Sequence, residues 1–279
     1  MASDTDLLRR NEPGIARLDR SLTPVVDRWL RLRARLERVP ARWYAAPTIG
    51  VAIGIALSTI QLWPEIWRER GTDYGFMVGH ARRWLDGGGF YQAEQLAGSY
   101  AGTSFTNYYP PPALLLFLPF TVLPGPLWWA IPLGVIAWFV LSERPAGWSW
   151  PILALLCYLP RTQSIVIWGN PTMWVTAFVA LGLRFAWPSV IVLVKPYFAP
   201  FALIGFWRRE WAPGAVAFAA INVVLLPLWF EYLAAWRNAR SWPGIGYSPA
   251  DFLMVLIPVV AWFAGRRRLS APSIRAPRP

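Results

Sequence analysis

The sequence predicts an all-α, polytopic membrane protein with about eight transmembrane helices and a helical first outer loop. Hydrophobic residues occupy 56% of the 279 positions and the mean hydropathy is +0.35, which is more apolar surface than a soluble chain of this length would bury. Several apolar runs of roughly 17–25 residues are long enough to cross a hydrocarbon layer of about 30 Å as helices. Arginines gather ahead of the first run, as they do on the cytoplasmic side of membrane proteins.

Residues 1–42 form a basic segment ahead of the first apolar run. Ten arginines lie between Arg9 and Arg42, in a chain whose net charge is +12. Apolar residues recur among them at helical spacing, namely Val25, Val26, Trp29, Leu32, Leu36 and Val39. This pattern is typical of an amphipathic helix lying on an anionic leaflet. We therefore expect a cytoplasmic N-terminus at the surface of a lipid bilayer, and no nucleic-acid partner.

The polytopic domain extends over residues 43–265 and a basic cytoplasmic tail over 266–279. The expected spans are 43–67, 110–124, 126–141, 148–160, 165–187, 188–207, 212–230 and 252–264. Eight crossings with both ends in the cytoplasm fit the positions of the basic residues best. Because one of these runs is short for a span, seven or nine crossings stay open as alternatives.

The longest polar interval of the domain is the outer loop, residues 68–109. Apolar residues recur in it at helical spacing, namely Tyr74, Met77, Val78, Ala81, Trp84 and Leu85. We expect a helix that lies along the outer surface and ends at Gly87-Gly88-Gly89, because three glycines readily turn the chain.

Asp73 lies where the first span emerges and this surface helix begins. An ionisable group at the bilayer surface beside an apolar span is a functional candidate. An acidic residue in a first helical turn is also favoured by the exposed amides and the helix dipole. Its position fits a catalytic carboxylate and a helix cap about equally well.

Lys195 is the only lysine among 27 Lys and Arg residues, a bias typical of a GC-rich bacterial genome. It lies inside an apolar run, where an isolated cation is costly unless it pairs or reaches a wet cavity. We expect it to bind an anionic group, most simply a phosphate, so that Lys195→Met weakens donor use more than folding. The alternative is that its side chain extends to the membrane interface.

His80, the only histidine, lies on the same predicted helix as Asp73. With Cys157 as the single, distant cysteine, it cannot build a zinc or haem site, and no Gly-rich phosphate loop is evident. We therefore expect neither a metal nor another cofactor. A packing role for His80 is favoured, and its proximity to Asp73 keeps acid–base work open.

Five short motifs occur in order: Asp73-Tyr74, Gly89-Phe90-Tyr91, Tyr109-Pro110-Pro111, Gly169-Asn170 and Lys195-Pro196-Tyr197. Together they resemble the GT87 family of GT-C type glycosyltransferases, which includes bacterial polyprenyl-phosphate-mannose-dependent mannosyltransferases. The resemblance covers roughly residues 45–230. The chain is shorter than typical members, and Gly-Asn stands where Gly-Gln is commoner.

The resemblance implies an inverting hexosyltransferase of a bacterial plasma membrane. It would move a hexose, usually mannose, from a polyprenyl-phosphate donor to a glycan or glycolipid acceptor at the outer face. Asp73 matches the acidic residue proposed as the general base of the family, in agreement with the need to deprotonate an attacking hydroxyl. The departing phosphate needs cations, for which we expect Lys195 and Arg161. Tyr74, His80, Tyr109 and Asn170 are further candidates for substrate or donor binding.

Two other functions compete with the enzyme. A transporter or flippase for a lipid-linked or anionic solute would gather polar groups near the bilayer midplane around broken helices. A non-catalytic envelope-assembly protein would need neither Asp73 nor a buried Lys195. Placement of Asp73 and Lys195 beside one cavity would favour the enzyme.

Overall fold

The computed structural model describes residues 31–61, 71–103, 106–241 and 248–265, together with Arg28 and Pro64. These residues are mostly helical, which confirms the all-α class. Most of the basic N-terminal segment and the whole tail 266–279 lie outside the described residues, although residues 31–37 are helical as expected.

The first half of the fold contains α3 (Ala41–Gln61), α5 (Thr72–Leu85), α6 (Ala93–Ala97), β1 (Tyr100–Ala101), α7 (Ala113–Phe117), the 3-10 helix η1 (Leu118–Thr121), α8 (Leu127–Glu143), η2 (Gly147–Ser149) and α9 (Trp150–Tyr158). The second half contains α10 (Pro160–Trp168), α11 (Thr172–Phe185), η3 (Trp187–Val194), η4 (Pro196–Phe198), α12 (Ala199–Ala202), α13 (Trp211–Val224), α14 (Leu226–Asn238), β2 (Ala239–Ser241), η5 (Pro249–Asp251) and α15 (Phe252–Ala264).

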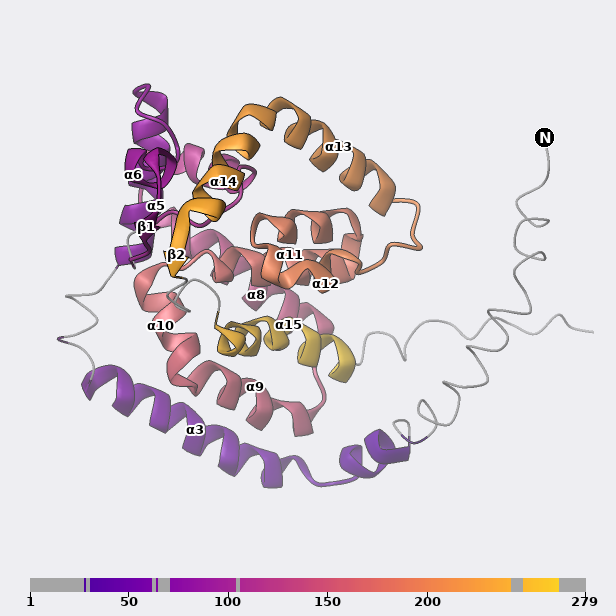
Figure 1. The fold of residues 1–279 in the computed structure, drawn as a ribbon. Helices are drawn as coiled ribbons and strands as arrows, with labels where there is room; N and C mark the ends of the chain where they lie inside the picture. Colours follow the sequence, from indigo (N-terminus) through magenta and orange to yellow (C-terminus); the bar gives the residue numbers. More distant parts are fainter. Residues whose placement is uncertain are drawn as a thin grey trace, which may run out of the picture.

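The helices pack around a centre made by α8, α11 and α15, which contact one another (Figure 1). Helix α9 packs against α15, and α3 lies along the outer side of α9. Helices α13 and α14 form an arch over α11 on the opposite side. Nearly every element therefore contributes one apolar face to a common core, in which Trp128, Phe117 and Ile165 are fully buried.

The outer loop folds as expected at its start. Helix α5 covers the predicted residues, buries Met77, Val78 and Ala81, and is followed by Gly87 and Gly89, both with φ of +80°. The rest of the loop packs on α14, since α6 contacts that helix and β1 pairs in parallel with β2.

The expected continuous helix over residues 188–207 is not observed. The segment consists of η3, η4 and α12, three short helical pieces that begin near Pro188, Pro196 and Pro200. Proline lacks an N–H and its ring clashes with the preceding turn, so three of them prevent one straight helix. The apolar composition was a correct guide to burial there, and a wrong guide to backbone continuity.

Among the described residues, no single helix combines the length and hydropathy that a membrane crossing requires. Two bent pairs meet that requirement jointly: Gly147–Tyr158 with Pro160–Trp168, bent by 58°, and Trp211–Val224 with Leu226–Asn238, bent by 76°.

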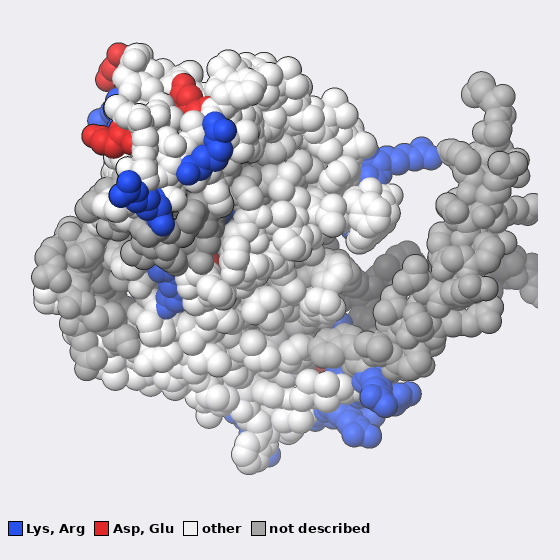
Figure 2. Space-filling view, in the orientation of Figure 1, with Lys and Arg blue, Asp and Glu red and all other residues white. Residues whose placement is uncertain are grey.

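Charged side chains are distributed unevenly over the surface. In Figure 2 the acidic side chains and several basic ones gather over α5 and α6, where Asp86 and Glu94 are exposed. Other basic side chains lie at the opposite edge near residues 31–42, and the broad area between the two edges carries few charges.

Candidate active site

Asp73 lies in the first turn of α5 and contacts a side chain from another part of the chain. Gly71 precedes the helix with φ of +73°, and its N–H donates to the Ile167 carbonyl at 2.9 Å, which ties this turn to α10. The Oδ2 atom of Asp73 accepts a hydrogen bond from Asn170 Nδ2 at 2.6 Å. The carboxylate is therefore held by a specific partner across the fold, rather than serving only its own helix.

The carboxyl of Asp73 is tuned by its surroundings. Burial raises its pKa above the ordinary value of 3.8, and the nearby Asp251 carboxylate acts in the same direction. The Asn170 hydrogen bond and the charges of Lys195 and Arg161 oppose that rise only in part. A carboxylate with a raised pKa is a better proton acceptor than an exposed one, as general bases require.

Asn170 lies in the short link between α10 and α11, and the link fixes its orientation. Its Oδ1 accepts from Thr172 N at 2.9 Å and from Thr172 Oγ1 at 2.7 Å, which leaves its Nδ2 pointing to Asp73. Gly169 ends α10 with φ of +72°, and a Cβ there would lie 2.8 Å from the Trp129 ring and 2.9 Å from Tyr74 Cβ. The glycine of the Gly-Asn pair is thus required by both backbone conformation and space, and the asparagine supplies the hydrogen bonds.

Lys195 is fully buried between η3 and η4 and bonds to three polar side chains. Its Nζ donates to Thr172 Oγ1 at 2.7 Å, to Asp251 Oδ2 at 2.8 Å and to Asn170 Oδ1 at 3.3 Å. An ammonium group has three protons, so these bonds use all of them. Lys195 does meet an anionic group, which is the Asp251 carboxylate, and it does not extend to the surface.

Asp251, in η5, completes the arrangement by joining the two cations. Its Oδ1 accepts from Arg161 Nε at 2.6 Å, opposite the bond from Lys195. The Arg161 side chain keeps 23% of its surface exposed and its guanidinium lies 5.6 Å from the Trp168 ring centre, whereas Asp251 has no exposed surface. Asp73, Arg161, Asn170, Thr172, Lys195 and Asp251 are called the site cluster below.

Asp251 and Thr172 were missed by the sequence reasoning. Asp251 stands immediately before the apolar run that begins at Phe252, so the rule that selected Asp73, a carboxylate at the end of an apolar run, applies to it equally. Thr172 gives no comparable signal, because a threonine in the first turn of a helix is common.

The other predicted site residues lie apart from these bonds. His80 is buried, its Nδ1 is 2.7 Å from an Arg83 nitrogen, and its ring packs edge-on against Phe76 at 4.2 Å. Burial, followed by the charge of Arg83, lowers the pKa of His80 to about 4. A histidine that stays neutral in a packed setting fits the packing role.

The two predicted tyrosines have structural contacts. The Tyr109 carbonyl accepts from the Tyr91 hydroxyl at 2.8 Å, and its N–H donates to Asn107 Oδ1 at 3.1 Å. Tyr74 stacks on Trp128 and Trp129 with ring centres 5.6 and 5.2 Å apart. Tyr74 therefore packs beside Gly169 next to the site cluster, while Tyr109 holds the outer loop together.

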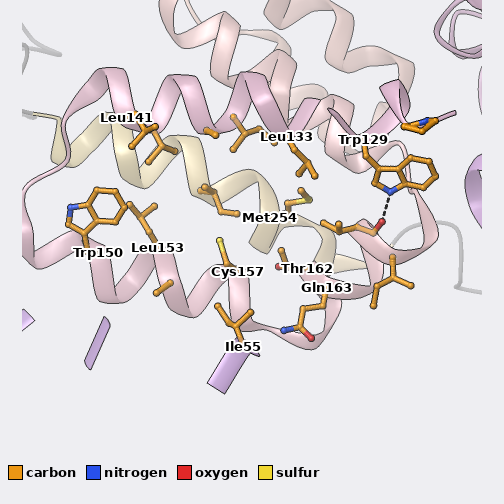
Figure 3. Close-up of a pocket in the computed structure, with 18 residues that line it drawn as sticks. Ile55, Trp129, Leu133, Leu141, Trp150, Leu153, Cys157, Thr162, Gln163 and Met254 are labelled. Carbon is orange, nitrogen blue, oxygen red and sulfur yellow. Dashed lines mark hydrogen bonds between the residues drawn. The ribbon is translucent and has the colours of Figure 1, made fainter. Parts of the chain in front are cut away.

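An apolar cavity of about 900 Å³ lies among the same helices, although no residue of the site cluster lines it. Its walls come from α3, α8, α9, α10 and α15, and Figure 3 shows Trp129, Leu133, Leu153, Cys157 and Met254 directed toward the same space. Its lining also includes Thr162 and Gln163, the two residues that follow Arg161. Both carry a buried polar atom without a hydrogen-bond partner, Thr162 Oγ1 and Gln163 Nε2. The cavity thus offers apolar walls together with two polar side chains from the turn of α10 that also carries Arg161.

Within the described part of the chain, no three His, Cys, Asp or Glu side chains are placed to hold a metal ion. The geometry suits the movement of a proton at Asp73 and the binding of an anion at Arg161. Comparisons with protein-family models, curated proteins and solved structures find no match to this chain.

Proposed function

We propose that this protein is an integral membrane hexosyltransferase with a polyprenyl-phosphate sugar, by the resemblance a mannose, as donor and a glycan or glycolipid as acceptor. The observation that carries the proposal is the site cluster itself. It links a carboxylate of raised pKa to a partly exposed arginine through Asn170, Lys195 and Asp251, beside an apolar cavity. Base, cation and lipid-chain space are the three parts that this reaction needs.

The roles follow from exposure and bonding. Asp73 accepts the proton of the acceptor hydroxyl as its oxygen attacks the anomeric carbon, and one displacement inverts that carbon. Arg161 contacts the departing phosphate, because its side chain is partly exposed whereas every proton of Lys195 is already used. Lys195 is then a positioning residue that orients Asn170 and Asp251. The prenyl chain lies in the cavity, with its phosphate toward Arg161.

Location in the plasma membrane is part of the proposal. Large apolar side chains point outward from several helices, among them Leu141 of α8 and Val216 and Val223 of α13, which are 65–71% exposed. An exposed apolar surface of this kind is expected where lipid covers it. The charged edges and the nearly uncharged area between them in Figure 2 fit the same view.

The decisive test is transfer by the purified protein reconstituted in lipid. Radiolabelled polyprenyl-phosphate-mannose and a membrane lipid extract should yield a labelled glycolipid, and Asp73→Asn should reduce that yield by at least a hundredfold. Asp86→Asn is the matched control, since it alters an exposed carboxylate at the other end of α5. Full activity of Asp73→Asn would remove Asp73 from the proposed role.

A second candidate function is a transporter or flippase for a lipid-linked or anionic solute. The fully buried Lys195–Asp251 pair and the break between α10 and α11 favour it, because transporters place charges at broken helices. Uptake of labelled lipid-linked sugar into sealed vesicles, without formation of a new glycosidic product, would select this function. If the protein shows neither uptake nor transfer, a non-catalytic role in envelope assembly is the function that remains.

A further inference from the structure

The charges of the site cluster balance before any substrate binds. Arg161 and Lys195 supply two positive charges, and Asp73 and Asp251 supply two negative ones. Asp251 has the more unusual place, since it is fully buried and binds both cations at once. Its carboxylate occupies the position between the two cations that an anionic ligand would otherwise take.

This balance has a consequence that rests on the proposed function. The donor is a phosphodiester with one negative charge. As the acceptor oxygen bonds to the anomeric carbon, its proton moves to Asp73, the bond from that carbon to the phosphate oxygen breaks, and the electron pair stays on the phosphate. The lipid product is a phosphomonoester with a second pKa near about 6, so it carries nearly two negative charges above pH 7.

The total charge is therefore unchanged by the transfer step itself. Asp73 becomes neutral as the phosphate gains its second charge, and the cluster then has a net charge of +1. Once Asp73 passes its proton to water, the net charge of the cluster returns to zero. The doubly charged product is then no longer held by a net positive charge. Asp251, Lys195 and Arg161 are the charged groups that surround Asp73 in this exchange.

We propose that Asp251 is a specificity-determining residue which, by cancelling one of the two cations, lets the singly charged donor bind and disfavours the doubly charged lipid product. Without that carboxylate the site would keep a net positive charge and retain the product. The arrangement differs from an anion site built from cations alone, which would bind the product more tightly than the donor.

The size of the effect follows from Coulomb's law. One unit charge about 7–10 Å from the phosphate, at an effective dielectric constant of about 20, changes the affinity per phosphate charge by roughly tenfold to fiftyfold. The product phosphate has two charges and the donor phosphate has one, so removing the charge of Asp251 changes the binding free energy of the product twice as much as that of the donor. The ratio of the two dissociation constants should therefore change by at least tenfold when the charge of Asp251 is removed.

The test compares two probes with the same chain, farnesyl phosphate and its methyl phosphodiester, at pH 8. Calorimetric titration of the detergent-solubilised full chain gives a Kd for each, and neither measurement depends on transfer. We expect the wild type to bind the phosphodiester more tightly, and Asp251→Asn to move the Kd ratio toward the phosphomonoester by at least tenfold. An unchanged ratio, with both probes bound, would overturn the role of Asp251 and leave the proposed function intact.

Two further variants separate charge from packing. Thr172→Val removes an uncharged partner of Asp251, so both affinities should change together and the ratio should stay within about twofold. Arg161→Gln removes a positive charge, so the ratio should move the opposite way; adding Asp251→Asn to it restores zero net charge and should bring the ratio back toward the wild-type value, and this double variant carries the test if Asp251→Asn alone does not fold. A ratio that moves equally in Thr172→Val, or that fails to move in Arg161→Gln, would contradict the inference. Failure of the wild type to bind either probe would remove the proposed function as well.

Discussion

The ion pair between Lys195 and Asp251 gives the sharpest prediction for folding. Both side chains have no exposed surface, and their Nζ and Oδ2 atoms are 2.8 Å apart. Lys195→Met removes the cation and leaves Asp251 buried with Arg161 and Thr172 as its remaining partners. Removing one member of a buried pair typically costs about 3–5 kcal/mol, because the other charge stays desolvated. We expect Lys195→Met to lose that much unfolding free energy, which replaces the expectation from the sequence that it would weaken donor use more than folding.

The same reasoning predicts partial recovery in a double variant. In Lys195→Met with Asp251→Asn, no unpaired buried charge remains, and Arg161 is exposed enough to stay hydrated. The loss should shrink to about 1–2 kcal/mol, so the two substitutions should couple by at least about 2 kcal/mol. Lys195→Met should therefore be rescued by a second substitution that, on its own, is also destabilising.

The assay is equilibrium unfolding in mixed micelles, followed by tryptophan fluorescence, for the wild type, both single variants and the double variant. A double variant whose loss equals the sum of the two single losses, within about 0.5 kcal/mol, would refute the reasoning. It would mean that the pair is hydrated in the folded protein, and that the bonds of Lys195 contribute independently of Asp251.

Four other predictions concern the site and the cavity. Because burial raises the pKa of Asp73, the transfer rate should fall on acidification at a pH above the ordinary carboxyl value of 3.8, and an acidic limb at or below that value in the pH–rate profile would contradict it. A raised pKa in the folded state also means that protonated Asp73 favours folding. This contribution is fully present below the pKa of the unfolded chain and is lost as the pH rises through the folded pKa. At pH 7 it is absent, so Asp73→Asn should melt no lower than the wild type. Gly169→Ala should cost about 1–3 kcal/mol, since its φ is +72° and the new Cβ would lie 2.8 Å from Trp129; an unaltered melting temperature would disprove this. Ala154→Trp should fill the cavity and raise the KM for donor at least fivefold, whereas Ala217→Trp on the exposed side of α13 should not, and equal KM values would exclude the cavity as the chain site.

The sequence predicted best where one short segment carries all of the information. The periodicity of α5 and the glycines after it specify a helix and its end, and both are observed. Hydropathy indicated the apolar segments, most of which are helical, but it counts apolar residues and does not follow the backbone or show which side chains are buried. The prolines in 188–207 therefore broke an expected helix into three pieces without exposing it.

The site was only partly accessible to the same reasoning, because its bonds join residues far apart in the chain. Asn170 bonds to Asp73 across 97 positions, and Arg161 bonds to Asp251 across 90. Residue type and position identified Asp73, Asn170, Lys195 and Arg161 as candidates, and no pattern in the sequence indicates that they share one network. Asp251 carried the same signal as Asp73, a carboxylate at the end of an apolar run, and lies outside the motifs of the resemblance.

Burial separates the residues that support the site from those that meet a substrate. A cation with no exposed surface and three bonds cannot reach a ligand without breaking bonds that compensate its own desolvation, which is the situation of Lys195. Arg161 keeps part of its side chain exposed while one nitrogen is fixed by Asp251, so it is oriented and still able to bind. Asp73 is placed in the same way, held by Asn170 through one oxygen. The two partly exposed groups are therefore the ones that we propose to act on substrate, and the fully buried Lys195–Asp251 pair supports them and balances their charge.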